Sequence, residues 1–154
     1  MTLGLPRIAY MRLIISRVSR ASVKAKGEIV GQIAKGLFVL VGVKKGDTEK
    51  NAEVLAEKLS KLRVMADKED KMNLSVKDTA GEILVVSQFT LYGDTKGGNR
   101  PSFIQAAEPE TAKRIYEKFV RELREKGIKV ETGSFGDYME IEALLDGPVT
   151  ILLE

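Results

Sequence analysis

Glu82-Ile-Leu-Val-Val-Ser-Gln-Phe-Thr-Leu-Tyr-Gly-Asp94 is the most informative segment of this sequence, because its character changes halfway along it. The aliphatic run at positions 83–86 follows a turn-forming glycine and predicts a buried strand. Ser-Gln-Phe-Thr at positions 87–90 then places three short hydrogen-bonding side chains at the end of that strand. This polar end needs an explanation, since buried polar groups without partners cost about 1–3 kcal/mol each.

Two interpretations of the polar strand end remain open at this level. Ser, Gln and Thr side chains often bond a neighbouring strand or a turn, and the motif would then be purely structural. A rigid strand end is also a good place to hold hydrogen-bond donors in fixed positions, which favours a binding or catalytic site.

A second motif, Asp146-Gly-Pro-Val-Thr150, interrupts two predicted strands, Met139–Leu145 and Val149–Leu153. Its glycine provides the most permissive backbone position, and its proline removes one hydrogen-bond donor from the sheet. Taken alone, the motif is interpreted as a plain hairpin turn between the two strands.

The composition of the 154-residue chain, with 44% hydrophobic and 31% charged residues, is typical of one compact globular domain. The chain contains no Cys and no His, which excludes disulfides, a thiol nucleophile and a Ser-His triad. We therefore expect no metal site and no cofactor, and any general base is a carboxylate, a Lys or a group on the substrate. The net charge of +3 leans toward a polyanionic partner. No apolar run approaches the roughly 20 residues needed to span a bilayer, so we expect a cytoplasmic protein without a membrane partner.

The hydrophobic patterns predict an α+β fold in a single domain, with largely antiparallel β-sheet layers and two main helices packed on one face. Residues 12–43 show only strand patterns separated by glycine turns. Residues 66–72 are polar and are expected to form a solvated loop. Residues 1–10 lack periodicity, and we interpret them as an N-terminal extension of a domain that covers residues 11–154.

Two segments have the spacing of amphipathic helices. The first begins after Asp47, a candidate N-cap, and the second begins at Pro109 and stops near Gly127. The predicted buried faces are Ala52, Leu55, Ala56, Leu59 and Leu62 in the first helix, and Ala112, Ile115, Tyr116, Phe119, Val120 and Leu123 in the second.

The two motifs occur together with three further segments in a fixed order. These are Arg12-Leu-Ile-Ile-Ser-Arg-Val-Ser-Arg-Ala-Ser-Val23, Gly98-Asn-Arg-Pro-Ser-Phe103 and Gly133-Ser-Phe-Gly-Asp-Tyr-Met139. The ordered set, which runs from Met11 to the end of the chain, resembles the D-aminoacyl-tRNA deacylase family (the D-tyrosyl-tRNA deacylases).

The resemblance implies hydrolysis of the ester between a D-amino acid and the terminal ribose of tRNA, a chiral proofreading step in translation. It assigns the catalytic site to Ser87, Gln88, Phe89 and Thr90, whose backbone N–H groups stabilise an oxyanion. The ribose 2′-hydroxyl then helps to activate water. Because Thr90 has neither a His partner nor an N-terminal position, covalent catalysis is disfavoured.

The resemblance also implies a C₂ homodimer in which a Gly-cis-Pro dipeptide of one subunit enters the partner's pocket and rejects L-amino acids. Gly147 and Pro148 match this dipeptide. Glycine has no side chain to reject, so glycyl-tRNA is a second expected substrate. Phe135 and Met139 are expected near the pocket, and Arg17 close to the dipeptide.

One position departs from the family pattern, because Leu145 stands where the family usually has Asn. The hydrogen bond that this Asn makes is therefore missing here.

The glycine-rich basic segment at residues 95–100 is a candidate contact for the acceptor end of the tRNA. Lys96 and Arg100 suit a close approach to phosphate or ribose, and a flexible solvent loop explains the same pattern equally well. We expect no DNA partner.

A non-catalytic RNA-binding module is the competing interpretation. It would use the basic residues near the N-terminus, although charges at strand spacing usually form a solvated face. Exposed stacking aromatics are scarce, which weighs against it. A metal- or Ser-dependent hydrolase is weaker still. The basic residues concerned are Arg12, Arg17, Arg20, Lys24 and Lys26.

Overall fold

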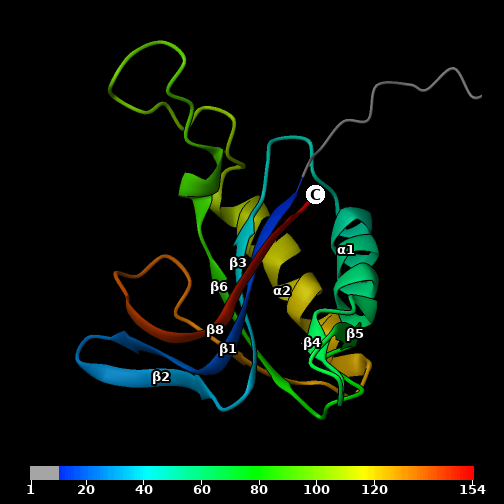
Figure 1. The fold of residues 1–154 in the computed structure, drawn as a ribbon. Helices are drawn as coiled ribbons and strands as arrows, with labels where there is room; N and C mark the ends of the chain where they lie inside the picture. Colours follow the sequence, from blue (N-terminus) through cyan, green and yellow to red (C-terminus); the bar gives the residue numbers. More distant parts are fainter. Residues whose placement is uncertain (1–10) are drawn as a thin grey trace, which may run out of the picture.

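The computed structural model describes residues 11–154, which form one six-stranded mixed β-sheet with two α-helices on one of its faces (Figure 1). The interpretation of residues 1–10 as an extension lies outside the described residues. The order of elements is β1 (Arg12–Ala25), β2 (Glu28–Ile33), β3 (Gly36–Gly42), α1 (Glu49–Lys61), β4 (Met65–Ala66), β5 (Met72–Leu74), β6 (Glu82–Ser87), the 3₁₀ helix η1 (Phe89–Tyr92), α2 (Pro109–Glu125), β7 (Lys129–Thr132) and β8 (Glu140–Leu153).

The sheet is mixed, which corrects the expectation of a largely antiparallel sheet. The long strand β1 pairs antiparallel with β2, β3 and β8, whereas β3 pairs parallel with β6, and β6 pairs parallel with β7. Parallel neighbours need a crossover connection, and the two helices provide these connections. α1 lies between β3 and β6 in the chain, and α2 lies between β6 and β7.

The aliphatic run of β6 is buried on both faces of the sheet. Ile83 and Val85 face the main core under the two helices, whereas Leu84 and Val86 belong to a second apolar cluster. This second cluster is formed mainly with residues of β1, β2 and β3. A strand covered on both sides has no polar face, which explains why its sequence does not alternate.

Both predicted helices and their buried faces are confirmed. All six predicted residues of α2 are buried, and in α1 only Leu62 lies past the end of the helix, partly buried against the same core. α2 begins at Pro109, and Gly127 follows its end with a φ of +82°. The predicted N-cap of α1 was wrong by one residue, because Thr48 is the cap and Asp47 is buried beside it.

β8 is one continuous strand, so the motif at residues 146–150 is not a hairpin turn. Both halves of β8 pair with the same strand, since Thr150 lies opposite Ser16 and Leu145 lies opposite Val18. Residues 146–149 therefore form a bulge opposite Arg17. A bulge of this kind turns the chain locally without ending the strand.

Two smaller findings complete the fold. The segment expected to be a solvated loop is the mostly exposed turn between the short antiparallel strands β4 and β5, and Asp67 closes this turn. Neither helix of residues 11–154 is long and apolar enough to cross a membrane.

Candidate active site

Of the polar segment expected at the end of the strand, only Ser87 belongs to the strand. β6 ends at Ser87, and Phe89–Tyr92 form the 3₁₀ helix η1. Between them, the Gln88 N–H donates to the Val41 carbonyl at 2.8 Å, which ties the start of the turn to β3. The motif is therefore a sharp strand-to-turn junction and not a continuing strand.

This junction presents two backbone donors that the fold does not use. Within residues 11–154, the N–H groups of Phe89 and Thr90 have no acceptor, as expected for the opening residues of a short helix. The Gln88 side chain donates from Nε2 to the Thr90 hydroxyl at 2.7 Å. The Gln88 and Thr90 side chains thus bond each other, and the backbone donors remain available to a ligand.

A cavity of about 780 Å³ lies over this junction. Six of the residues singled out from the sequence line this cavity. Four come from the end of β6 and the start of η1, and two come from the loop that precedes β8. These residues are Ser87, Gln88, Phe89, Thr90, Phe135 and Met139. Sequence segments more than forty positions apart thus line one cavity.

A further wall of the cavity was not predicted from the sequence. It is formed by Val43 and Lys45 after β3 and by the segment from Phe103 to Ala112. Backbone hydrogen bonds hold these two parts together, from the Lys45 N–H to the Gln105 carbonyl and from the Ala107 N–H to the Val43 carbonyl, both at 2.9 Å. Phe103 carried a signal as the end of the Gly98–Phe103 motif, whereas Pro109 and Ala112 were predicted only as helix positions and not as part of a site.

The loop before β8 is folded tightly against the sheet. The Ser134 N–H lies 3.3 Å from the Met139 sulfur, and a Cβ at Gly133 would lie 2.8 Å from the same sulfur. The Phe135 ring packs 5.8 Å from the ring of Tyr116 on α2, measured between centroids. These contacts fix Phe135 and Met139 as an apolar wall of the cavity.

Gly147, Pro148 and Arg17 lie outside this cavity, on the β8 bulge and the strand opposite it. The Gly147–Pro148 peptide bond is cis, and Gly147 has a φ of +129°. Arg17 is indeed close to the dipeptide, since its Nε lies 3.2 Å from both the backbone carbonyl and the carboxylate of Asp146. Its Nη1 donates to the Val64 carbonyl at 2.9 Å.

Leu145, the departure from the family pattern, lies directly before the bulge with half of its surface exposed. It is one of four exposed large apolar residues of β8, and the others are Ile141, Leu144 and Leu152.

Lys96 and Arg100 are exposed and do not line the cavity. They lie in the loop that follows η1, which projects from the body of the molecule at the upper left of Figure 1. Two hydrogen bonds of 2.8 Å between Asp94 and Ser102 close the base of this loop. Both cations thus lie outside the cavity.

Two of the five basic residues of the RNA-binding alternative are engaged in the fold. Arg12 and Arg17 each donate to a backbone carbonyl at 2.9 Å, so they do not form a freely solvated basic strip. Among the described residues, no group of three or more acidic side chains is arranged to hold a metal ion.

Comparison with known proteins agrees with this geometry. A model of the family described as D-Tyr-tRNA(Tyr) deacylase matches residues 14–154. The chain is 57% identical over 144 residues to the D-aminoacyl-tRNA deacylase of Thermotoga petrophila, covering 94% of this chain and 97% of the relative. It is 56% identical over 144 residues to that of Koribacter versatilis, with the same coverage of each chain.

Two solved structures share the fold. The c-Myc DNA unwinding element binding protein superposes with a TM-score of 0.86 at 41% identity, covering 93% of this chain and 97% of the other. A probable eukaryotic D-amino acid tRNA deacylase superposes with a TM-score of 0.83 at 14% identity, covering 94% and 99%, and this second likeness concerns the fold alone. The matched model, the close relatives and the shared fold show together that the chain belongs to the D-Tyr-tRNA(Tyr) deacylase family.

Proposed function

We propose that this protein is a D-aminoacyl-tRNA deacylase, an esterase that releases a free D-amino acid and tRNA. The relatives that carry this name cover nearly the whole chain at more than half identity. The observation that carries the proposal is the pair of unused N–H donors of Phe89 and Thr90, two residues that line the cavity. An aminoacyl ester is already activated, so two well-placed donors and a water molecule suffice for its hydrolysis.

In the proposed reaction, water attacks the ester carbonyl carbon and forms a tetrahedral intermediate. The negative oxygen accepts hydrogen bonds from the Phe89 and Thr90 N–H groups, and one such donor is worth about 2.7–4 kcal/mol in the transition state. The bond to the ribose oxygen then breaks, and the proton lost by water passes to that oxygen with help from the neighbouring 2′-hydroxyl. This route needs no His, no Cys and no cofactor.

Rejection of L-amino acids is assigned to Gly147 and Pro148 of a second subunit. The two residues do not line the cavity of their own chain, so they act on a pocket only if another copy presents them to it. A backbone wedge beside the α-carbon excludes any L side chain, whatever its identity. Glycine is not excluded by such a wedge, and glycyl-tRNA is therefore a second substrate.

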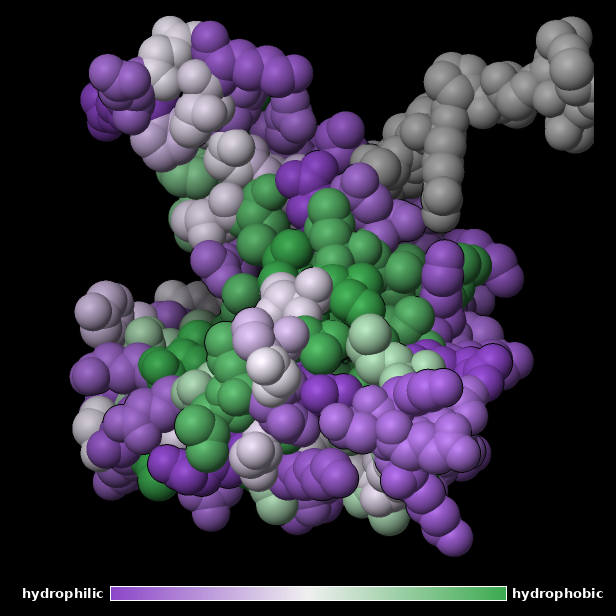
Figure 2. Space-filling view, in the orientation of Figure 1, coloured by the Kyte–Doolittle hydropathy of each residue, from purple (hydrophilic) through white to green (hydrophobic). Residues whose placement is uncertain are grey.

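The surface of β8 supports the homodimer. Figure 2 shows apolar surface gathered over the middle of the face on which β8 crosses the sheet in Figure 1. The exposed apolar residues on β8 include Leu144 and Leu152, which are 48% and 52% exposed. A contiguous apolar patch of this kind on a soluble domain is typical of a protein interface. The proposed partner is a second copy of this chain, related by a twofold axis.

Lys96 and Arg100 extend the site toward the phosphates of the tRNA acceptor end. Their exposed loop gives the cations access to a polyanion without placing charge inside the apolar cavity. We place the protein with the translation apparatus in the cytoplasm.

The test is deacylation of matched D-tyrosyl-, L-tyrosyl- and glycyl-tRNA by the purified protein. We expect rapid release of D-tyrosine and glycine, and release of L-tyrosine at the spontaneous rate. Binding of tRNA without release of D-tyrosine above the spontaneous rate would contradict the proposal and favour an RNA-binding module.

A further inference from the structure

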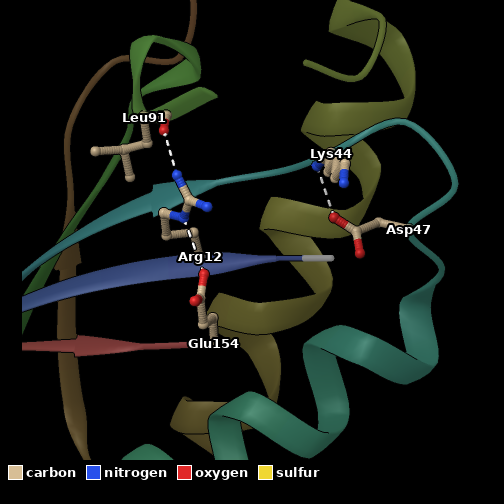
Figure 3. Close-up of polar contacts among 5 residues, drawn as sticks. All are labelled: Arg12, Lys44, Asp47, Leu91 and Glu154. Atoms are coloured by element: carbon tan, nitrogen blue, oxygen red, sulfur yellow. Dashed lines mark hydrogen bonds and ion pairs between the residues drawn. The ribbon is translucent and has the colours of Figure 1, made fainter. Parts of the chain in front are cut away.

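The side chain of Arg12 reaches from β1 toward the 3₁₀ helix η1 and bonds the Leu91 carbonyl (Figure 3). Its Nη1 donates to the carbonyl of Leu91 at 2.9 Å, and its Nε donates to the Glu154 carboxylate at 3.0 Å. Its guanidinium carbon also lies 5.0 Å from the centroid of the Tyr92 ring. One side chain therefore contacts two consecutive residues of η1 and the last residue of the chain.

The same turn is held from the adjacent strand. Gly42 lies opposite Arg12 in the β1–β3 pairing. A Cβ at Gly42 would lie 2.9 Å from the Tyr92 ring and 3.0 Å from the Leu91 Cβ. Tyr92 is only 4% exposed. This side of η1 is thus packed against the ends of β1 and β3 with no room for an added methyl group.

These contacts matter because η1 is short. A 3₁₀ helix of four residues has few internal hydrogen bonds and relatively poor geometry, so tertiary contacts determine its position. The Leu91 carbonyl that Arg12 holds belongs to the residue directly after Thr90. A shift of this carbonyl would therefore move the peptide units that carry the Phe89 and Thr90 donors.

We propose that Arg12 is a positioning residue for the deacylase site, holding η1 so that its backbone donors stay aimed at the oxyanion. This inference rests on the proposed function. Arg12 is not among the residues that line the cavity, so its effect falls on the chemical step and not on substrate binding. Arginine suits this role because its planar fork offers separate donors and a face that stacks on an aromatic ring, whereas lysine offers a single point charge.

The first experiment compares Arg12→Gln, Arg12→Lys and Arg63→Gln with the unchanged protein in steady-state deacylation of D-tyrosyl-tRNA. Arg63 is a matched control, because its Nε also donates to a backbone carbonyl at 2.9 Å, that of Asn73, away from the cavity. We expect kcat of Arg12→Gln to be at least tenfold lower than that of the unchanged protein, because a misplaced N–H donor stabilises the transition state less well. KM should stay within about twofold of the unchanged value. The kcat of Arg12→Lys should lie between those of Arg12→Gln and the unchanged protein, and the kcat of Arg63→Gln should equal that of the unchanged protein.

Glu154→Gln tests whether the effect of Arg12 comes from its bond to η1 or from its ion pair with Glu154. This variant removes the ion pair but leaves the Arg12–Leu91 bond in place, so its kcat should stay within about twofold of the unchanged value. A loss as large as that of Arg12→Gln would overturn the inference, and so would an effect of Arg12→Gln on KM alone.

NMR spectra report on η1 without relying on deacylase activity, so this inference can fail independently of the proposed function. In NMR spectra of folded Arg12→Gln or Arg12→Lys, the Phe89 and Thr90 amide resonances should shift relative to those of the unchanged protein. The amides of β6 should not change. Unaltered Phe89 and Thr90 amides would overturn the positioning role whether or not the protein hydrolyses D-tyrosyl-tRNA. An inactive unchanged protein would instead refute the proposed function.

Discussion

The η1 junction and the β8 bulge are both irregular breaks at a strand, but they relate to their own chain in opposite ways. η1 packs against Gly42 and Arg12 and borders the cavity that lies over the polar strand end. The bulge at residues 146–149 interrupts a strand that is mostly exposed, and it lines no part of that cavity. The donors therefore lie at the cavity of their own chain, whereas the proposed selectivity element lies outside it.

The two regions are also held in place by different contacts. The turn into η1 is tied to β3 by the Gln88 N–H, and the proposed positioning residue Arg12 bonds the Leu91 carbonyl. The bulge is anchored mainly through Arg17, which bonds Asp146 on the bulge and Val64 near β4. Rate enhancement and selectivity should therefore be separable by mutation.

The largest effect is expected from Gly147→Ala. At a φ of +129° an L side chain is strained, and the added Cβ would lie 3.0 Å from the Val149 Cγ2 and 3.3 Å from the Arg17 Nη2. The bulge should move, and D-tyrosyl-tRNA turnover should fall at least tenfold, with a reduced preference for D over L substrates. Deacylation of D- and L-tyrosyl-tRNA measures both quantities.

Gly127→Ala is the control for backbone strain alone, because Gly127 has a φ of +82° and no atoms within 4 Å of an added Cβ. It should lower the melting temperature but leave turnover per folded molecule unchanged. Equal losses of turnover in the two variants would show that the bulge has no specific role.

The next effect is expected from Leu144→Lys, which places a charge in the apolar patch of β8. If this patch is the dimer interface, burying an unpaired ammonium should raise the dimer dissociation constant at least about tenfold, which corresponds to about 1.4 kcal/mol. Discrimination against L-tyrosyl-tRNA should then fall at low protein concentration, where monomers prevail. Sedimentation velocity across a concentration series provides the measurement.

Val54→Lys on α1 is the matched control, because Val54 is 53% exposed and Leu144 is 48% exposed. It should sediment as the unchanged protein does. Full D-over-L discrimination by a demonstrated monomer would refute the cross-subunit wedge.

A smaller effect is expected from Thr90→Ala. The Thr90 hydroxyl accepts a hydrogen bond from Gln88 and has no His or Cys to activate it. Loss of a general base or nucleophile typically costs about 10²–10⁴-fold, whereas loss of this hydroxyl should lower kcat by less than about tenfold. Single-turnover deacylation of D-tyrosyl-tRNA checks this, and a larger loss in a folded, tRNA-binding variant would revive a covalent mechanism.

Asp47→Asn should leave both regions unaffected and change only the pH dependence of stability. Burial raises the pKa of Asp47 to about 6, partly offset by the Lys44 N–H, which donates to its Oδ2 at 2.7 Å. Because its pKa is higher in the folded state, the stabilisation from this group is present below about pH 4 and is lost as the pH rises through about 6.

The neutral variant should therefore gain about 2 kcal/mol in free energy of unfolding relative to the unchanged protein between about pH 4 and pH 7. Urea unfolding at several pH values measures this difference. A difference that does not vary with pH would contradict the raised pKa, and a changed D-over-L ratio would contradict the separation of the two regions.

The sequence by itself determined the helices and the chemistry available to the protein. The buried face of α2 was predicted in full, because helical periodicity is a local property and Pro109 marks the start of the helix. The absence of His and Cys excludes most nucleophiles by composition alone. The polar Ser87–Thr90 motif likewise identified the strand end where backbone donors were expected.

The tertiary structure alone decided which strands pair and which residues share the cavity. The parallel pairing of β6, the use of Lys45 and Phe103 as cavity walls, and the bond of Arg12 to η1 depend on contacts between distant segments. The predicted hairpin turn became a bulge for the same reason, since both flanks of Gly147–Pro148 pair with β1. Local patterns report which face of an element is apolar, but the partner of that face is chosen by packing across the whole chain.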